Sequence, residues 1–203
     1  MNNSIRDIND LPSIERVKSV AQGLALLDAI IMPDWESRYF SFNSNWDGGG
    51  KEMMASMRDG SGNELFLHFT DSGVAGKVLF SSALSNASEH LNIVPNAFES
   101  FKLEPAFSND KASLFFWRGA EQLVWNSSPK KLEEYPLLGF LVGGGTSYGV
   151  LVEEYYEKDV DYKLIEEVLS SLTVTEEQLF SINPGVGIRD LADDFQEIFG
   201  RAI

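Results

Sequence analysis

Cysteine is absent from this sequence of 203 residues, and histidine occurs only twice, at His68 and His90. The lack of cysteine excludes disulfide bonds, thiol nucleophiles and thiolate metal ligands. Two imidazoles cannot complete a tetrahedral zinc site without carboxylates. The sequence therefore predicts no metal centre, and no pattern in it predicts a cofactor.

Long apolar runs are also missing. No stretch reaches the roughly 18 to 20 apolar residues that a membrane-spanning helix needs. The N-terminal sequence, MNNSIRDINDLPSIERV, has neither the basic start nor the apolar stretch of a secretory signal. We therefore expect no membrane association and a cytoplasmic location.

Positive charge is scarce. The chain has 16 basic and 31 acidic residues, a net charge of −15, and residues 132–203 hold 15 of the acids and only 4 of the bases. A field of this sign repels nucleic acid and attracts basic surfaces. We expect no nucleic-acid partner and a protein partner with a basic surface. An acidic surface that only keeps the protein soluble is the simpler alternative.

Residues 1–126 have the pattern of one helix followed by antiparallel strands. Apolar residues recur every three or four positions from Ile14 to Ile31, after a capping Ser13 and before Pro33, which predicts an amphipathic helix. Turn-forming residues at 59–63 and 71–73 separate apolar runs of strand length. The predicted strands are 38–43, 52–58, 64–70, 74–80, 112–117 and 122–126, with a loop and helical turn at 81–91 and a short helix at 95–103.

Beyond a predicted linker near residues 127–131, the apolar period changes from two to about 3.6. Helices are expected around 148–156, 162–172, 175–182 and 188–199, and the glycines at 143–145 are expected to form a flexible connection into the first of them. We predict a single domain over residues 1–203 with an α+β fold. Its N-terminal helix would pack on an antiparallel meander sheet (1–126), followed by a helical C-terminal part (132–203).

Five short segments carry motifs that point to a family. They read FNSNW, MASMRDGSG, YYE, INP and DLADDFQEI, at residues 42–46, 54–62, 155–157, 182–184 and 190–198. They resemble a widespread bacterial family of uncharacterised small proteins with the patterns FNxxW, MxSMRxGxG and NP…DLAxDxxEI. The chain departs from the family at its end, where Phe199-Gly200 replaces the usual Gly-Tyr. The resemblance implies no enzymatic activity and no catalytic residues; size and acidity suggest an immunity-like role by analogy alone.

Three motifs of catalytic or binding sites fail on their context. Residues 145–149 match G-x-S-x-G around Ser147, but the hydrolase pattern needs a histidine after the serine, and both histidines precede it. The segment from Asp59 superficially resembles a calcium loop, but Glu64 stands where the loop needs its glycine and Thr70 where it needs its last glutamate, so a hairpin turn is favoured. His68 near Asp71 is interpreted as a partly buried strand histidine instead of a general base.

Our leading hypothesis is a protein-binding module that presents carboxylates to a basic partner. Two dense acidic clusters on helix-patterned segments, together with one tryptophan, are the candidate binding residues: Glu153, Glu154, Glu157 and Asp159; Asp190, Asp193, Asp194 and Glu197; and Trp46. The alternative is a hydrolase or carbohydrate-active enzyme with a carboxylate pair in a cleft between sheet and helices. A purely structural or oligomerising domain is the third possibility, which an apolar patch at the first helix would indicate.

Overall fold

A six-stranded antiparallel sheet forms the centre of the protein in the computed structural model, which describes residues 4–80, 84 and 86–203. Its strands pair strictly in chain order, which confirms the predicted meander. The strands are β1 Phe40–Asn43, β2 Met53–Arg58, β3 Glu64–Thr70, β4 Gly73–Leu79, β5 Leu114–Gly119 and β6 Asn126–Ser128.

Seven α-helices and six 3-10 helices complete the described part of the chain. The α-helices are α1 Ile14–Ile31, α2 Ala87–Ile93, α3 Glu99–Leu103, α4 Gly139–Tyr155, α5 Tyr162–Ser171, α6 Glu176–Ile182 and α7 Ala192–Phe199. The 3-10 helices are η1 Ile8–Asp10, η2 Trp35–Ser37, η3 Asn96–Phe98, η4 Pro105–Phe107, η5 Asn109–Lys111 and η6 Ile188–Leu191. No helix among the described residues is long and apolar enough to cross a membrane.

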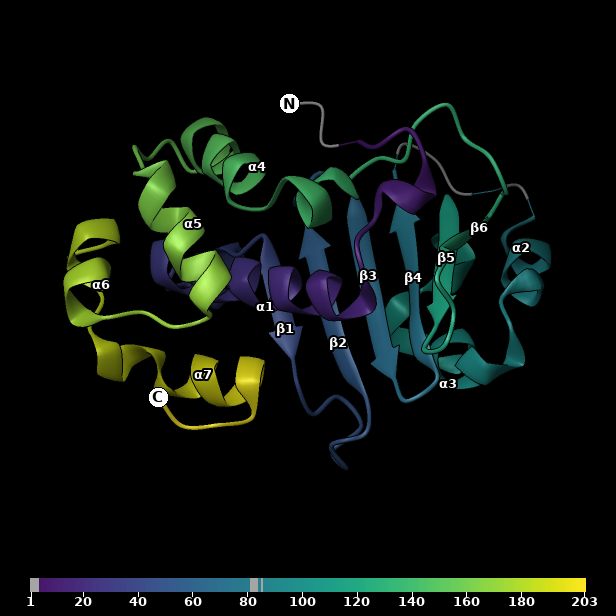
Figure 1. Ribbon diagram of the computed structural model, residues 1–203, viewed down its shortest axis with the longest axis horizontal. Coiled ribbons are helices and arrows are strands. Elements are labelled where there is room, and N and C mark those ends of the chain that lie inside the picture. The colour runs from purple at the N-terminus through teal and green to yellow at the C-terminus, as the bar shows by residue number, and fades with distance from the viewer. Residues whose placement is uncertain (1–3, 81–83, 85) are drawn as a thin grey trace.

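The two faces of the sheet are covered by different helices (Figure 1). α1 crosses one face and packs with α4, α5 and α7 over the larger core, which takes Leu65, Leu67 and Phe69 of β3. The opposite face carries Phe66 and a smaller aromatic core beneath α2 and α3. Successive strand residues point to opposite faces, so the alternation in β3 produces both cores. The predicted α+β arrangement, with the first helix on the meander, is confirmed.

The turn between β2 and β3 forms as its sequence predicts. Asp59 accepts the backbone N–H groups of Ser61 at 2.8 Å and Asn63 at 3.0 Å, while Gly60 and Gly62 take positive φ angles of 67° and 97°. A side chain at either glycine would strain this backbone. The turn therefore holds the Asp59 carboxylate at one end of the sheet.

A buried carboxylate on α1 joins the sheet to the helical part. Asp28 accepts the backbone N–H groups of Tyr39 at 2.6 Å and Phe40 at 2.7 Å, at the start of β1. It also accepts the hydroxyl groups of Tyr148 at 2.6 Å and Tyr156 at 3.0 Å. A buried polar group needs such partners to offset its desolvation. Asp28 thus fixes β1 and α4 on α1.

Several boundaries differ from those that the sequence predicts, and the differences at the sixth strand are the clearest in the sheet. Most of the predicted strand 122–126 is a loop, in which Leu123 is 87% exposed while Trp125 is buried in the larger core, and the sixth strand starts only at Asn126. Ser127 and Ser128 of the predicted linker are buried in that strand and pair with β5. Backbone pairing to the aromatic β5 buries these small polar side chains, which composition alone assigns to a linker. Residues 81–83 and 85 of the predicted loop lie outside the described residues.

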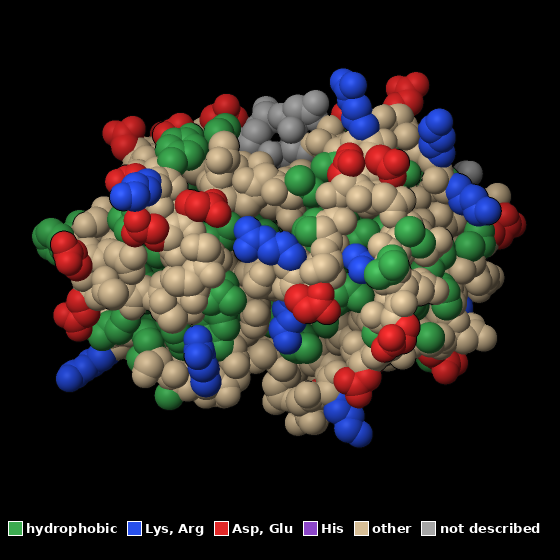
Figure 2. All heavy atoms as spheres, in the orientation of Figure 1, with side chains coloured by type: hydrophobic (Ala, Val, Ile, Leu, Met, Phe, Trp, Pro, Cys, Tyr) green, Lys and Arg blue, Asp and Glu red, His purple; other side chains and the backbone are tan. Residues whose placement is uncertain are grey.

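Two further differences are in the helical part. The glycines at 143–145 lie inside α4, which is interrupted at Gly144 with φ 50° and ψ −128°. The segment 188–199 is divided into η6 and α7, so Asp190 does not lie on the same helix as Asp193. Acidic side chains are spread over both halves of the face shown in Figure 2, including the part over α4, α5 and α6.

Candidate functional site

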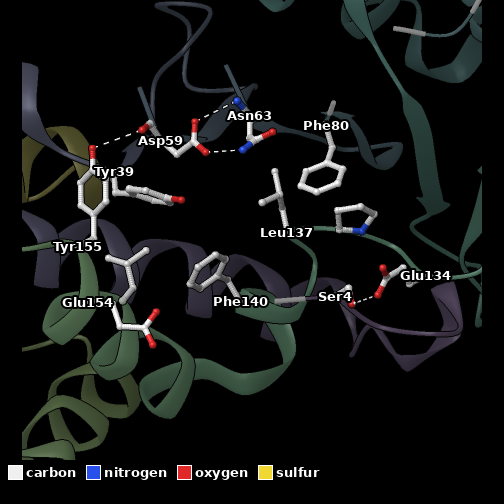
Figure 3. Close-up of a pocket in the computed structure, with 12 residues that line it drawn as sticks. Ser4, Tyr39, Asp59, Asn63, Phe80, Glu134, Leu137, Phe140, Glu154 and Tyr155 are labelled. Atoms are coloured by element: carbon white, nitrogen blue, oxygen red, sulfur yellow. Dashed lines mark hydrogen bonds between the residues drawn. The ribbon is translucent and has the colours of Figure 1, made fainter. Parts of the chain in front are cut away.

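A hollow of about 360 Å³ opens where the turn between β2 and β3 meets the start of α4. Its lining comes from the N-terminal segment, the starts or ends of four strands, and both ends of α4 (Figure 3). The hollow therefore lies at the junction of the sheet and the helical part. We call it the acidic hollow, because three carboxylates line it.

Aromatic rings make up much of its surface. Tyr39 packs edge to face against Tyr155, with ring centroids 5.2 Å apart, and its ring lies 6.1 Å from that of Phe140. Phe80, 42% exposed, lines the side opposite the tyrosines (Figure 3). Burial, with Asp59 as the second cause, raises the pKa of the Tyr39 hydroxyl. These rings offer π faces and edges to a ligand.

The three carboxylates around these rings are those of Asp59, Glu134 and Glu154. Figure 3 shows Glu154 and Glu134 on opposite sides of Phe140, and Asp59 above it. The described residues that line the hollow include no lysine, arginine or histidine. The site therefore has a strongly negative potential beside aromatic rings, a combination that favours a cation.

Local hydrogen bonds position the carboxylates of Asp59 and Glu134. The Asp59 carboxylate is held by the amides of the turn between β2 and β3, and the Tyr155 hydroxyl donates to the Asp59 backbone carbonyl at 3.3 Å. Glu134 accepts the hydroxyl of Ser4 at 2.5 Å. The contact of Tyr155 ties α4 to the turn, and that of Ser4 ties the N-terminal segment to the chain that leads into α4.

The first acidic cluster predicted from the sequence is only partly brought to this site. Glu154 lines the hollow. Glu153 instead accepts the hydroxyl of Tyr162 at 2.9 Å, which raises the pKa of that tyrosine. Glu157 and Asp159 are exposed beyond the end of α4 and are not part of the lining.

The second cluster has mainly structural contacts. Asp194 forms an ion pair with Arg38, and Asp190 accepts the backbone N–H of Gly187 at 2.8 Å. Glu197 receives a long hydrogen bond of 3.5 Å from the amide of Asn43, and burial followed by the charge of Asp194 raises its pKa. Of the four acids, only Asp193 is exposed without a hydrogen bond or ion pair to the described residues. Asp193, Asp194 and Glu197 share α7, and Asp190 lies before it in η6.

Trp46 does not line the acidic hollow, and Ser44, two residues before it, donates its backbone N–H to the backbone carbonyl of Glu197 at 2.8 Å. Trp46 follows β1, at the end opposite the turn of Asp59, and stacks on Phe107 with a centroid distance of 6.0 Å and an interplanar angle of 16°. Its half-buried ring packs against the smaller core. The structure gives Trp46 a packing role and does not bring it to the acidic hollow.

Both histidines have protein partners. His68 is buried, and its Nε2 lies 3.1 Å from Glu52 Oε2, so Glu52 and not Asp71 is its carboxylate neighbour. Burial lowers the pKa of His68, although Glu52 opposes the shift. His90 Nδ1 lies 2.8 Å from Ser128 Oγ and links α2 to β6. Ser147 lies within α4, which is not the strand-to-helix elbow of a hydrolase.

Sequence reasoning missed most of the acidic hollow. It interpreted Asp59 only as a turn residue and gave no role to Tyr39, Glu134 or Phe140. Their proximity depends on contacts between segments far apart in the chain, such as the 96 positions between Tyr155 and Asp59. No group of three or more possible metal ligands was found among the described residues.

Comparisons with family models, with curated proteins and with solved structures found no match to this chain. The resemblance to the widespread bacterial family of small proteins therefore stays a prediction. Any inference about function rests on the geometry and charge of the acidic hollow.

Proposed function

We propose that this chain is a protein-binding module that receives a basic side chain of its partner in the acidic hollow. The observation that carries the proposal is the set of three carboxylates around aromatic rings, with no basic side chain in the described lining. A lysine or arginine over an aromatic face contributes about 0.5–2 kcal/mol, and hydrogen bonds to charged groups about 1.5–3 kcal/mol each.

The charge of the whole chain supports the same interpretation. A net charge of −15 accelerates the encounter with a basic surface, and salt weakens that effect. After this electrostatic encounter, the acidic hollow would bind one basic side chain of the partner specifically. An immunity-like role, suggested by analogy alone, is compatible with a partner that has a basic surface.

The enzymatic alternative has weaker support. The acidic hollow does lie between the sheet and the helical part, where a catalytic carboxylate pair was expected. The Asp59 carboxylate, however, is engaged by the amides of its own turn, and Figure 3 shows Phe140 between Glu134 and Glu154. Glycosidases need two carboxylates facing one bond across roughly 5–9.5 Å. We therefore favour binding over hydrolysis.

Affinity capture from the native lysate at low salt, with stepwise salt elution, tests the proposal. The bait is compared with a Glu134→Gln/Glu154→Gln variant and with a matched control, Glu177→Gln/Asp193→Asn, which removes two exposed acids elsewhere. We expect one basic protein, released by moderate salt, whose affinity falls at least tenfold in the first variant and stays unchanged in the control. An equal loss of affinity in both variants would mean that only the net charge matters, and it would overturn the proposed role of the acidic hollow in binding.

A further inference from the structure

A second hollow, of about 410 Å³, is lined by residues close in sequence to those of the first. Three basic side chains, Arg6, Lys130 and Lys131, line it together with the indoles of Trp117 and Trp125. We call it the basic hollow. Basic side chains are seen together at the upper right of Figure 2, with acidic ones beside them.

The cations of this hollow are not neutralised by ion pairs. Among the residues that the structure describes, none forms a salt bridge with Arg6, Lys130 or Lys131. The one carboxylate in the lining, Asp7, accepts the backbone N–H of Asn9 at 2.9 Å and its amide at 3.3 Å. In a chain with only 16 basic residues, three such cations around one hollow leave a local positive site.

A short antiparallel bridge separates the two hollows. The N–H of Ile5 donates to the carbonyl of Tyr135 at 3.1 Å, and the N–H of Tyr135 donates to the carbonyl of Ile5 at 2.6 Å. Ser4 lines the acidic hollow and Arg6 the basic one, two positions apart along this extended segment. Two residues of a strand span about 7 Å, so along this segment the lining of one hollow follows that of the other closely enough for one extended ligand segment to reach both.

We propose that the two hollows are one binding surface for a segment of the partner protein that carries a basic side chain and, two to four residues away, an acidic one. This inference rests on the proposed function of the acidic hollow. Two to four residues of extended chain span about 7–14 Å, which matches a step across the Ile5–Tyr135 bridge. Because the negative hollow lies beside the positive one, the surface favours a partner segment whose basic and acidic side chains come in the matching order. It disfavours segments that carry charges of one sign only.

Amide NMR spectra of the full chain test the inference with three probes. These are an uncharged Gly/Ser peptide with one arginine, the same peptide with one glutamate, and a peptide with both charges three positions apart. The arginine peptide is expected to shift amides of the acidic hollow, such as Asn63 and Leu137. The glutamate peptide is expected to shift those of Arg6 and Tyr135. The peptide with both charges should bind at least tenfold more tightly than either.

Reversing the charge of one lysine in the basic hollow tests whether that hollow causes the tenfold gain in affinity of the peptide with both charges. Lys131→Glu should abolish the tenfold gain and leave the affinity for the arginine peptide within twofold, whereas Lys51→Glu, an exposed change outside both hollows, should preserve it. A gain that survives Lys131→Glu, or no gain at all, overturns the inference while binding of the arginine peptide keeps the proposed function. Shifts from the glutamate peptide alone would instead reject the proposed function.

Discussion

Tyr148 donates its hydroxyl to Asp28 at 2.6 Å across 120 positions of sequence, and both side chains are fully buried. The contact joins α4 to α1, while the same carboxylate accepts the N–H of Tyr39. Tyr39 lines the acidic hollow, so the position of its ring depends on this buried anchor. The proposed binding site is thus coupled to the stability of the core.

Replacement of Asp28 by Asn should destabilise the fold strongly. An Asn has one acceptor oxygen, and its NH₂ group would face donors that the second carboxylate oxygen now accepts. We expect a loss of about 2–4 kcal/mol in the free energy of unfolding, since buried donors lose their partners. Urea denaturation measures it. Tyr148→Phe removes one donor only and should cost about 1 kcal/mol; equal losses in both variants would contradict the central role of the carboxylate.

The protonation of Asp28 should depend on pH near neutrality. Burial raises its pKa to about 6, although the two tyrosine hydroxyls and two backbone amides favour the charged form. Because the folded pKa lies above the unfolded one, the folded state binds more protons between them. The stabilising contribution of Asp28 is complete below the unfolded pKa and is lost as pH rises through about 6. A carboxyl-carbon NMR titration should place its midpoint near 6; a midpoint below that of an exposed aspartate would refute the shift.

His68 should respond to the loss of its carboxylate neighbour. Burial lowers its pKa and Glu52 raises it, so Glu52→Gln is expected to lower the pKa further. A depressed histidine pKa means that the unfolded state binds the proton first, so stability falls as pH drops below the unfolded value. Proton NMR of the imidazole follows the titration. His90 serves as the internal control, because Glu52 is not among its hydrogen-bond partners; a rise in the pKa of His68 would contradict this prediction.

The ion pair of Arg38 and Asp194 should matter for stability and not for partner binding. The two side chains are only 11% and 16% exposed, and Arg38 also donates to the backbone carbonyls of Met32 at 2.9 Å and Pro33 at 3.0 Å. Breaking a buried pair leaves a charge without its partner, so Asp194→Asn should cost about 1–3 kcal/mol. Thermal unfolding measures the cost. Loss of partner binding by the folded variant would restore the second acidic cluster as a binding site.

The sequence predicts the meander well because its signals are local. Turn residues 59–63 and the alternation of Leu65, Phe66 and Leu67 define neighbouring strands without distant contacts. The start of α1 is equally local, since Ser13 caps it by accepting the N–H of Arg16. Where tertiary pairing decides, as for Ser127 and Ser128 in β6, composition predicts a linker instead.

The spacing of residues along the sequence does not predict which residues line the acidic hollow. Glu154 belongs to a visible acidic cluster, but Glu134 and Tyr39 have no such context in the sequence. They meet because Asp28 fixes β1 beside α4 and because Ile5 pairs with Tyr135. The density of acidic residues in the sequence predicts an acidic surface, whereas the tertiary contacts determine which of its carboxylates line the hollow.

The strict chain order of the strands also bears on how the protein folds. Each strand pairs with a neighbour in sequence, so the meander can form by closing short loops, which is fast. The Asp28–Tyr148 contact closes a separation of 120 positions and carries a larger loop entropy, so it forms later. The proposed binding surface is therefore expected to be the last part of the molecule to assemble, so a nascent chain would form its sheet before the acidic hollow exists.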